Sequence, residues 1–510
     1  MRRVFWYNTR KIGFFKPRLW KTPARCVIIL CYIEIGLSEG TFLERHTTVI
    51  SQPELDRQAA ICREIASYWK AEGRTPLAFV DTYGCQQNEA DSERIRGMLR
   101  ACGYRMSDTE EGADCIVINT CAIREHAETR VYGNVGALVH TKNRHPTQKI
   151  FLCGCMMGQP TVVEKIKHSY HHVDGVFNPH QLWRFPELLQ SVLTRRKRIF
   201  AVDDSAGNIA EGIPVVRASK LKAWVSIMYG CNNFCSYCIV PYVRGRERSR
   251  RPEEIIEEVK GLIAAGYKDI TVLGQNVNSY GKDLDCGVDF ADLMASLAEL
   301  PGDFWLRFMT SHPKDASHKL FDTIASHDKI CNQFHLPFQS GNDRVLKAMN
   351  RHYNRAQYLE LVDYGRKVMP NLVLTSDVIV GFPGETEEEF EDTISLIEQV
   401  RYDALFTFIF SPRGGTPAAK MEDPTPKEEK NRRFDKLCNV QNRISLEIHQ
   451  AYVGKTMRVL VDGRDGENLT ARTEGGRLVR LPGDDSLIGQ FIDAKITGCT
   501  TWSLVGEVFD

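Results

Sequence analysis

The stretch Tyr229-Gly230-Cys231-Asn232-Asn233-Phe234-Cys235-Ser236-Tyr237-Cys238 decides the fold of the central part of this chain. It follows an apolar run at residues 224–228, which we predict to be the first strand of a strand–helix series. Three cysteines at C-x3-C-x2-C spacing can hold three corners of a cubane iron–sulfur cluster. A structural zinc site usually takes four ligands in two pairs, and no second close pair follows here. We therefore predict that Cys231, Cys235 and Cys238 bind a cluster with one iron open to chemistry.

The strand–helix series continues to about residue 410. The predicted strands are residues 224–228, 270–273, 305–309, 333–336, 372–380 and 405–410, and the helices between them include residues 252–265 and 385–400. Such a series predicts a partial or complete β/α barrel, which we assign to residues 215–446. The active sites of these barrels lie at the carboxyl ends of the strands, where the cluster motif is also expected.

A second strand–helix series precedes the barrel. Apolar runs at residues 77–80, 115–118 and 150–152 predict a parallel α/β domain over residues 75–205. Each run leads to a cysteine, and these cysteines are Cys85, Cys121 and Cys155. The carboxyl ends of parallel strands meet at one edge of a sheet, so the three thiolates can converge on a second cluster. Three unrelated buried cysteines are the alternative, and we interpret Cys102, Cys115 and Cys153 in that way.

The two ends of the chain differ from the middle. Residues 1–74 begin with a basic stretch and contain an apolar run at 26–37 that is too short to cross a bilayer. We expect them to be a disordered or dispensable extension. Residues 195–198 and 203–212 predict an exposed linker. Short strands at 457–462, 477–481 and 492–497 predict a small antiparallel β-barrel over residues 447–510. The predicted fold class is therefore α/β with an added β-barrel.

Composition separates two classes of protein. The chain has 16 cysteines, which suit either a disulfide-rich secreted protein or a metal protein in a reducing compartment. They are spread along 510 residues and no signal peptide is evident, so we favour the second class and expect a cytoplasmic protein, monomeric and without a membrane partner. The 66 basic and 65 acidic residues leave no net charge that would indicate nucleic acid.

Four stretches resemble the methylthiotransferase family of radical S-adenosylmethionine enzymes. They are Thr82-Tyr83-Gly84-Cys85-Gln86-Gln87-Asn88, Asn119-Thr120-Cys121-Ala122-Ile123-Arg124-Glu125-His126-Ala127, Gly154-Cys155-Met156 and Ile239-Val240-Pro241-Tyr242-Val243-Arg244-Gly245-Arg246-Glu247-Arg248-Ser249-Arg250. The resemblance covers roughly residues 75–510 and favours the type that acts on dimethylallyladenosine in tRNA.

The resemblance implies a reaction and its cofactors. Cys85, Cys121 and Cys155 would hold an auxiliary 4Fe-4S cluster, and Cys231, Cys235 and Cys238 the radical-generating 4Fe-4S cluster. One S-adenosylmethionine would methylate a sulfur, and a second would supply the radical that acts on carbon-2 of an adenosine next to the tRNA anticodon. A reducing system such as flavodoxin or ferredoxin and a sulfur donor would be partners. Residues 447–510 resemble the TRAM RNA-binding domain, with Ala471 where its usual motif has glycine.

Further candidates follow from the strand ends and the local charge. Cofactor contacts are predicted for Tyr237, Gln275, Asn276, Gln339, Gly381 and Pro383, although Gly381-Phe382-Pro383-Gly384 is also a common turn. RNA contacts are predicted for Arg244, Arg246, Arg248, Arg250 and Arg472, with a solvated charged loop as the alternative. His312, His335 and His352 could relay protons or simply be core or surface residues.

Other functions stay open at this point. The same chemistry could act on threonylcarbamoyladenosine in tRNA or on an aspartate of a ribosomal protein. A non-catalytic iron–sulfur protein that binds RNA is the alternative from another class.

Overall fold

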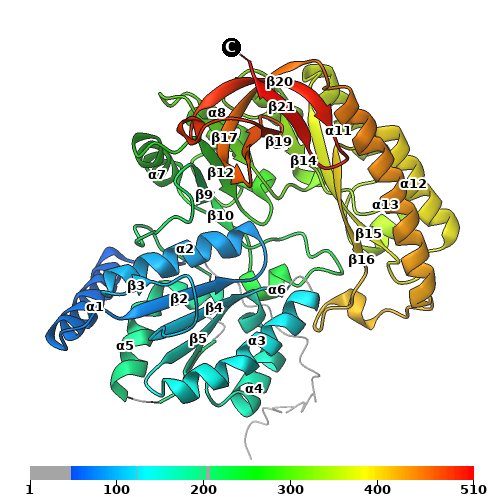
Figure 1. Cartoon of the computed structure of the whole chain (residues 1–510). Helices are drawn as coiled ribbons and strands as arrows, with labels where there is room; N and C mark the ends of the chain where they lie inside the picture. Colours follow the sequence, from blue (N-terminus) through cyan, green and yellow to red (C-terminus); the bar gives the residue numbers. More distant parts are fainter. Residues whose placement is uncertain (1–47, 123–124, 196, 203–206, 510) are drawn as a thin grey trace, which may run out of the picture. The chain divides into compact units, whose positions relative to one another are not determined.

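The computed structural model describes residues 48–122, 125–195, 197–202 and 207–509 (Figure 1). The predicted extension up to residue 47, and residues 203–206 of the predicted linker, lie outside the described residues. Among the described helices, none combines the length and the apolar character that crossing a membrane requires.

The N-terminal domain is a six-stranded sheet in the order β3-β2-β4-β5-β6-β7, with all neighbouring strands parallel. Its strands are β2 (Leu77–Thr82), β3 (Arg105–Met106), β4 (Cys115–Thr120), β5 (Lys149–Gly154), β6 (Gly175–Phe177) and β7 (Ile199–Ala201). Its helices are α1 (Gln52–Ala71), α2 (Gln86–Ala101), α3 (Glu125–Arg144), α4 (Pro160–Ser169) and α5 (Phe185–Arg195), with short 3-10 helices η1 (Cys155–Gly158) and η2 (Pro179–Arg184). Every residue of the central strand β4 is buried, as expected for a parallel strand covered on both faces.

Two apolar clusters cover the two faces of this sheet. Side chains of α1, α2 and α5 form one cluster, and side chains of α3 and α4 form the other. The prediction that residues up to 74 are dispensable is wrong for α1, because Ile61, Ile65 and Trp69 are buried in the first cluster. In addition, β1 (Thr48–Val49) pairs with β8 (Asn208–Ile209), so this segment is also tied to the stretch after β7.

The predicted linker also needs correction. Residues 199–201, which lie between its two stretches, form the edge strand β7. Residues 208–209, within the second stretch, form β8 and pair with β1. Arg198, just before β7, donates hydrogen bonds to backbone carbonyls, among them Val173 O at 2.9 Å and Lys167 O at 2.8 Å. An arginine in a run of charged residues can therefore link neighbouring elements, because its guanidinium donates hydrogen bonds to their backbone carbonyls.

The central domain is a partial β/α barrel. Its strands β9 (Lys222–Ser226), β12 (Asp269–Leu273), β13 (Trp305–Phe308), β14 (Gln333–His335), β15 (Val373–Val380) and β16 (Ala404–Ile409) match the six predicted runs closely. They form two parallel three-stranded sheets, β13-β12-β9 and β14-β15-β16. A parallel bridge between Leu306 and Ile330 joins the two sheets, and no pairing between β9 and β16 is found among the described strands, so the barrel is open there.

Helices cover the outside of the barrel and bury its main core. They are α7 (Pro252–Ala264), α8 (Phe290–Ala298), α9 (His318–Ala325), α10 (Asp343–Ala348), α11 (Arg355–Val368), α12 (Glu387–Val400) and α13 (Lys427–Gln450). Loops at the strand ends carry α6 (Val240–Arg244), the two-residue strands β10 (Met228–Tyr229) and β11 (Arg248–Ser249), and the 3-10 helices η3 (Val277–Ser279), η4 (Pro313–Asp315) and η5 (Pro417–Lys420). The start of α12 is fixed by a capping box between Thr386 and Glu389.

The C-terminal domain is a closed five-stranded barrel in the order β17-β18-β19-β21-β20. Its strands are β17 (Thr456–Asp465), β18 (Asn468–Thr473), β19 (Leu478–Leu481), β20 (Phe491–Cys499) and β21 (Leu504–Val508), with η6 (Asp485–Leu487) between β19 and β20. The prediction of an antiparallel barrel is confirmed except at one position, because β19 and β21 are parallel. A parallel pair lets a five-stranded Greek-key sheet close on itself.

Candidate functional site

The first three cysteines follow three adjacent strands. Cys85 comes after β2, Cys121 after β4 and Cys155 directly after β5, all at the carboxyl edge of the N-terminal sheet. Gly84 has φ +126°, and a Cβ there would lie 2.7 Å from Cys121 Cβ and 3.0 Å from its sulfur. Only glycine permits this approach, so the loops that carry Cys85 and Cys121 meet because residue 84 has no side chain.

A buried arginine from the barrel reaches this cysteine set. Arg244 Nε donates to Cys155 Sγ at 3.0 Å, and Nη2 donates to Asn88 Oδ1 at 2.9 Å and to Asp91 Oδ2 at 2.8 Å. Burial raises the pKa of Cys155 to about 12, although the neighbouring Arg244 opposes that shift. Such a thiol stays protonated at neutral pH unless a metal takes its proton's place, so Cys155 is not a free nucleophile.

The second cysteine set lies in the loop after β10. Gly230 has φ +79°, and a Cβ there would lie 1.9 Å from Arg246 O, so the loop again requires glycine. The loop is tied internally, since Cys238 N donates to Cys235 O at 2.9 Å. Arg351 Nη1 donates to Cys235 Sγ at 3.4 Å, and burial raises the pKa of Cys231 to about 12. Each cysteine set thus has one sulfur that accepts a hydrogen bond from a buried arginine.

The donor chemistry of both sets fits an iron–sulfur cluster. Among the described residues, no three His, Cys, Asp or Glu side chains surround a single metal ion. A cubane is held differently, because each thiolate bonds its own iron and the cluster fills the space between the ligands. Each set has three buried or partly buried thiols and an arginine that can stabilise thiolate charge, which is consistent with that arrangement.

The predicted cofactor contacts lie around the carboxyl ends of the barrel strands. Gln275 Oε1 accepts from Gly230 N, so it supports the cluster loop directly. Asn276 Nδ2 donates to Asp315 Oδ2 at 2.8 Å. Tyr237 is partly buried and packs in a small apolar cluster with Phe382 and Phe410. These positions agree with a role near a cofactor, which stays a prediction.

Several buried polar atoms at this end have no hydrogen-bond partner in the described structure. They are both amide atoms of Asn233, Asn276 Oδ1, Asn278 Nδ2, Ser311 Oγ, His312 Nε2 and Gln339 Oε1. They come from the loops after β10, β12, β13 and β14. Buried polar groups are costly when unpaired, so a concentration of both donors and acceptors indicates a polar ligand. Asn278 belongs to the Gly274-Gln275-Asn276-Val277-Asn278 stretch that the sequence places after the second barrel strand. Asn233 and Ser311 were not predicted as contacts, and the signal that could have found them is their position shortly after a strand end.

His312 has a defined protonation state. Burial lowers the pKa of its imidazole far below the ordinary value, so the ring is neutral. Nδ1 accepts from Lys314 N at 3.2 Å, which places the ring proton on Nε2. His312 is therefore a buried hydrogen-bond donor and no cation.

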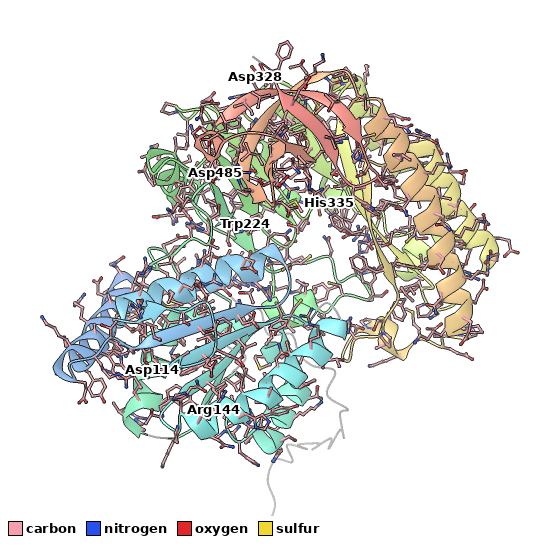
Figure 2. The ribbon with its side chains drawn as sticks, viewed as in Figure 1. Asp114, Arg144, Trp224, Asp328, His335 and Asp485 are labelled. Carbon is pink, nitrogen blue, oxygen red and sulfur yellow. The ribbon has the colours of Figure 1, made fainter. Side chains whose placement is uncertain are left out.

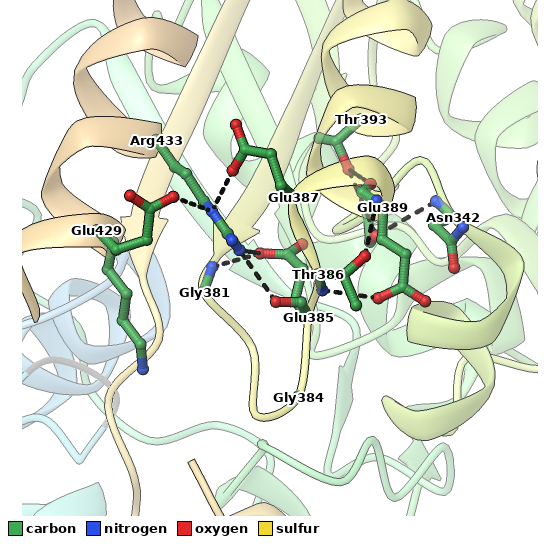
Figure 3. Close-up of polar contacts among 12 residues, drawn as sticks. Asn342, Gly381, Gly384, Glu385, Thr386, Glu387, Glu389, Thr393, Glu429 and Arg433 are labelled. Atoms are coloured by element: carbon green, nitrogen blue, oxygen red, sulfur yellow. Dashed lines mark hydrogen bonds and ion pairs between the residues drawn. The ribbon is translucent and has the colours of Figure 1, made fainter. Parts of the chain in front are cut away.

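The Gly381-Phe382-Pro383-Gly384 loop is held by the buried Glu385 (Figure 3). Gly381 N donates to Glu385 Oε2 at 2.7 Å, and Arg433 Nη1 in α13 donates to Glu385 O at 3.0 Å. Burial raises the pKa of Glu385 to about 7 despite these donors. The loop thus has a fixed shape, with Pro383 buried within it.

Three of the predicted RNA contacts must be corrected. Arg244, Arg248 and Arg250 are only 4–5% exposed. Arg250 pairs with Glu211 at 2.6 Å and Glu258 at 2.8 Å, while Arg248 Nη1 donates to the carbonyls of residues 244 and 246 at 2.9 Å. Buried guanidinium groups that are taken up by protein acceptors cannot present charge to phosphate.

The other two predicted RNA contacts remain accessible. Arg246 is exposed, and its guanidinium lies 4.5 Å from the ring centre of Phe234. Arg472 is partly exposed and lies 3.3 Å from Asp462. These two arginines stay predictions for phosphate contact.

Comparison with known proteins agrees with this architecture. Residues 225–397 match the Radical SAM superfamily, residues 78–178 match Uncharacterized protein family UPF0004 and residues 450–509 match the TRAM domain.

Proteins named tRNA-2-methylthio-N(6)-dimethylallyladenosine synthase are similar along most of their length. The one from Acetivibrio thermocellus is 48% identical over 92% of this chain and 100% of its own, and the one from Alkaliphilus oremlandii is 48% identical over 91% and 99%. The Clostridioides difficile protein is 48% identical over 88% and 94%.

The solved structure of the radical S-adenosylmethionine methyltransferase TsrM from Kitasatospora setae has a TM-score of 0.50. It is 12% identical over 78% of this chain and 81% of its own, which is a likeness of fold alone.

Proposed function

The chain belongs to the tRNA-2-methylthio-N(6)-dimethylallyladenosine synthase family of radical S-adenosylmethionine enzymes, and we propose that it converts N6-(dimethylallyl)adenosine next to the tRNA anticodon to its 2-methylthio derivative. The observation that carries the proposal is the presence of two separate sets of three cysteines. The first set lies at the carboxyl ends of three parallel strands, and the second lies in the single loop that follows β9 and β10. The unpartnered buried polar atoms in the loops after β10, β12, β13 and β14 support a polar cofactor at this end of the barrel.

Membership of the superfamily implies one 4Fe-4S cluster and S-adenosylmethionine. We assign that cluster to Cys231, Cys235 and Cys238, and a second, auxiliary cluster to Cys85, Cys121 and Cys155. When bound, the two clusters would supply the electron that cleaves S-adenosylmethionine and the sulfur that takes a methyl group from a second S-adenosylmethionine.

The chain's own residues would bind, orient and shield. His312 Nε2 and Asn278 Nδ2 can donate to a carboxylate or a hydroxyl, and Gln339 Oε1 can accept from an amino group. Arg244 and Arg351 hold Cys155 and Cys235 through hydrogen bonds to sulfur. The burial of these groups excludes water from a site that generates reactive species.

Two surfaces would contact RNA. The match to the TRAM domain suggests that the C-terminal barrel takes part, with Arg472 as a candidate. Arg246 offers exposed charge next to the cluster loop. A reductant such as flavodoxin or ferredoxin and a sulfur donor complete the proposed partners, and we expect a monomer that acts in the cytoplasm.

Anaerobic iron and sulfide analysis tests the cofactor assignment. Wild-type protein should hold about eight irons per chain, and Cys231→Ala about four, because one cubane is lost. The control is Cys153→Ala, because this thiol is buried and is not an assigned ligand. It lies in β5 opposite Asn119 of β4, so all irons should remain. About four irons in the wild type would contradict the second cluster.

Nucleoside analysis tests the reaction itself. Wild-type enzyme with S-adenosylmethionine and a reductant should form 2-methylthio-dimethylallyladenosine in tRNA, and Cys231→Ala should form none. If Cys231→Ala still produced the methylthio nucleoside, the radical mechanism would be wrong.

A further inference from the structure

Strand β16 exposes aromatic side chains although it belongs to the barrel sheet. Phe406 is 48% exposed and Phe408 is 36% exposed. The residues between them point the other way: Leu405 packs against the main core, and Thr407 Oγ1 lies 3.7 Å from Cys438 Sγ in α13. Since side chains alternate along a strand, α13 covers one face of β16 and the two phenylalanines occupy the opposite face.

The opposite face is the concave interior of the barrel. The ring of Phe406 lies 5.7 Å from the ring of His335 in β14, although β15 runs between the two strands. Side chains two strands apart meet only when the sheet curves toward them. Asp377 in β15 is directly opposite Phe406, and His335 Nε2 lies 3.6 Å from Asp377 Oδ1 (His335 is labelled in Figure 2).

This aromatic strip leads toward the cluster loop. Phe410, two residues beyond Phe408, packs against Phe382 with ring centres 5.4 Å apart. Tyr237, between two of the cluster cysteines, packs against the same apolar cluster. The exposed phenylalanines therefore lie on the inner wall just below the loops that hold the proposed cofactor site.

We propose that Phe406 and Phe408 form the apolar wall that receives the dimethylallyl group of the substrate adenosine. This inference rests on the proposed function and names the part of the site that sets substrate specificity. Two partly exposed aromatic side chains on the inner face of a barrel suit a branched hydrocarbon, because its burial removes apolar surface from water on both partners.

The same wall disfavours a threonylcarbamoyl group. That substituent carries a carboxylate, which would lose its hydration against the two rings. The carboxylate of Asp377, on the strand position facing Phe406, would also repel it. Phe406, Phe408 and Asp377 together therefore select an apolar N6 substituent over a charged one.

Equilibrium binding separates this role from cofactor loading. Anaerobic fluorescence anisotropy would measure cluster-loaded enzyme, without S-adenosylmethionine, against anticodon stem–loops that carry either dimethylallyladenosine or unmodified adenosine. Phe406→Ala and Phe408→Ala should each reduce the preference for the modified stem–loop roughly tenfold and leave affinity for the unmodified one unchanged. Phe406→Leu should keep most of the preference, since it stays apolar.

The control is Tyr68→Ala, which removes an exposed aromatic side chain from α1 and should change neither affinity. Unchanged preference in both alanine variants would overturn the inference, while methylthiolation of dimethylallyl tRNA by the wild type would still support the proposed function. A wild type that does not favour the dimethylallyl stem–loop and does not methylthiolate it would instead overturn the proposed function.

Discussion

Replacement of Arg244 by methionine tests whether this arginine is structural. Its guanidinium and the carboxylate of Asp91 are 2.8 Å apart, with side chains only 5% and 6% exposed. Methionine keeps much of the side-chain length but removes the charge, so the buried Asp91 loses its nearest cation and keeps Arg94, whose Nη1 lies 4.0 Å away. A truncated buried ion pair costs roughly 3–5 kcal/mol when the remaining charge is unpaired, and the more distant Arg94 should place this loss near the lower end of that range. For a domain of this size, that loss corresponds to roughly 10 °C in melting temperature.

Arg246→Met is the matched control, two residues along the same loop. Arg246 is exposed, and its guanidinium lies over the face of the Phe234 ring, so its loss should destabilise the protein much less than the loss of the buried Arg244. For RNA binding, the exposed Arg246 should matter more than the buried Arg244. Arg246→Met should weaken tRNA binding and reduce the salt slope by about one, whereas Arg244→Met should leave the slope unchanged.

Anaerobic thermal unfolding by near-UV circular dichroism measures the stability change, and filter binding over a salt series measures the RNA response. A double-mutant cycle with Asp91→Asn should show coupling, since that change removes the charge that Arg244 leaves behind. The reasoning is refuted if Arg244→Met melts like the wild type and lowers the salt slope for tRNA.

Three further results are expected. Trp69→Ala should destabilise the N-terminal domain by roughly 3–5 kcal/mol in thermal unfolding, because its buried ring packs on Tyr104 at 5.7 Å; an unchanged melt would mean that α1 is dispensable after all. Gly230→Ala should lose about four irons per chain in iron analysis, since its Cβ would lie 1.9 Å from Arg246 O, and a full complement would contradict the loop geometry. Glu385 has a folded pKa of about 7, above its ordinary 4.5, so the folded state holds an extra proton between these values and stability should fall as pH rises through that window. Glu385→Gln should flatten the fall in a pH series of melting temperatures, and an equally steep fall would assign it to another group.

The strands and the cysteines could be predicted because their signals are local. Each barrel strand is a short apolar run, and the structure places all six within a few residues of the prediction. Cys85, Cys121 and Cys155 each follow such a run, so strand register alone brings them to one edge. The folded helix α1 was missed because its apolar residues have a partner surface only once the sheet has formed.

The unpartnered polar atoms could not be predicted individually. Asn233 and Ser311 look like ordinary loop residues, and only the burial of their side chains without partners distinguishes them. Burial of a loop side chain depends on which other loops cover it, and that is a property of the assembled barrel.

The sequence by itself determined the order of the domains, the strand series and the two cysteine sets. The reason is that apolar runs mark where strands end, and the spacing of the cysteines shows which thiols can bind the same cluster. Only the tertiary structure decided which arginines are buried. Arg244, Arg246, Arg248 and Arg250 alternate in one basic run, yet Arg246 alone of the four is exposed. The others are taken up by acceptors such as Asp91 and Glu258 or by nearby carbonyls. An ion pair between distant positions has no local signature, since the charge of each residue is visible in the sequence and its partner is not.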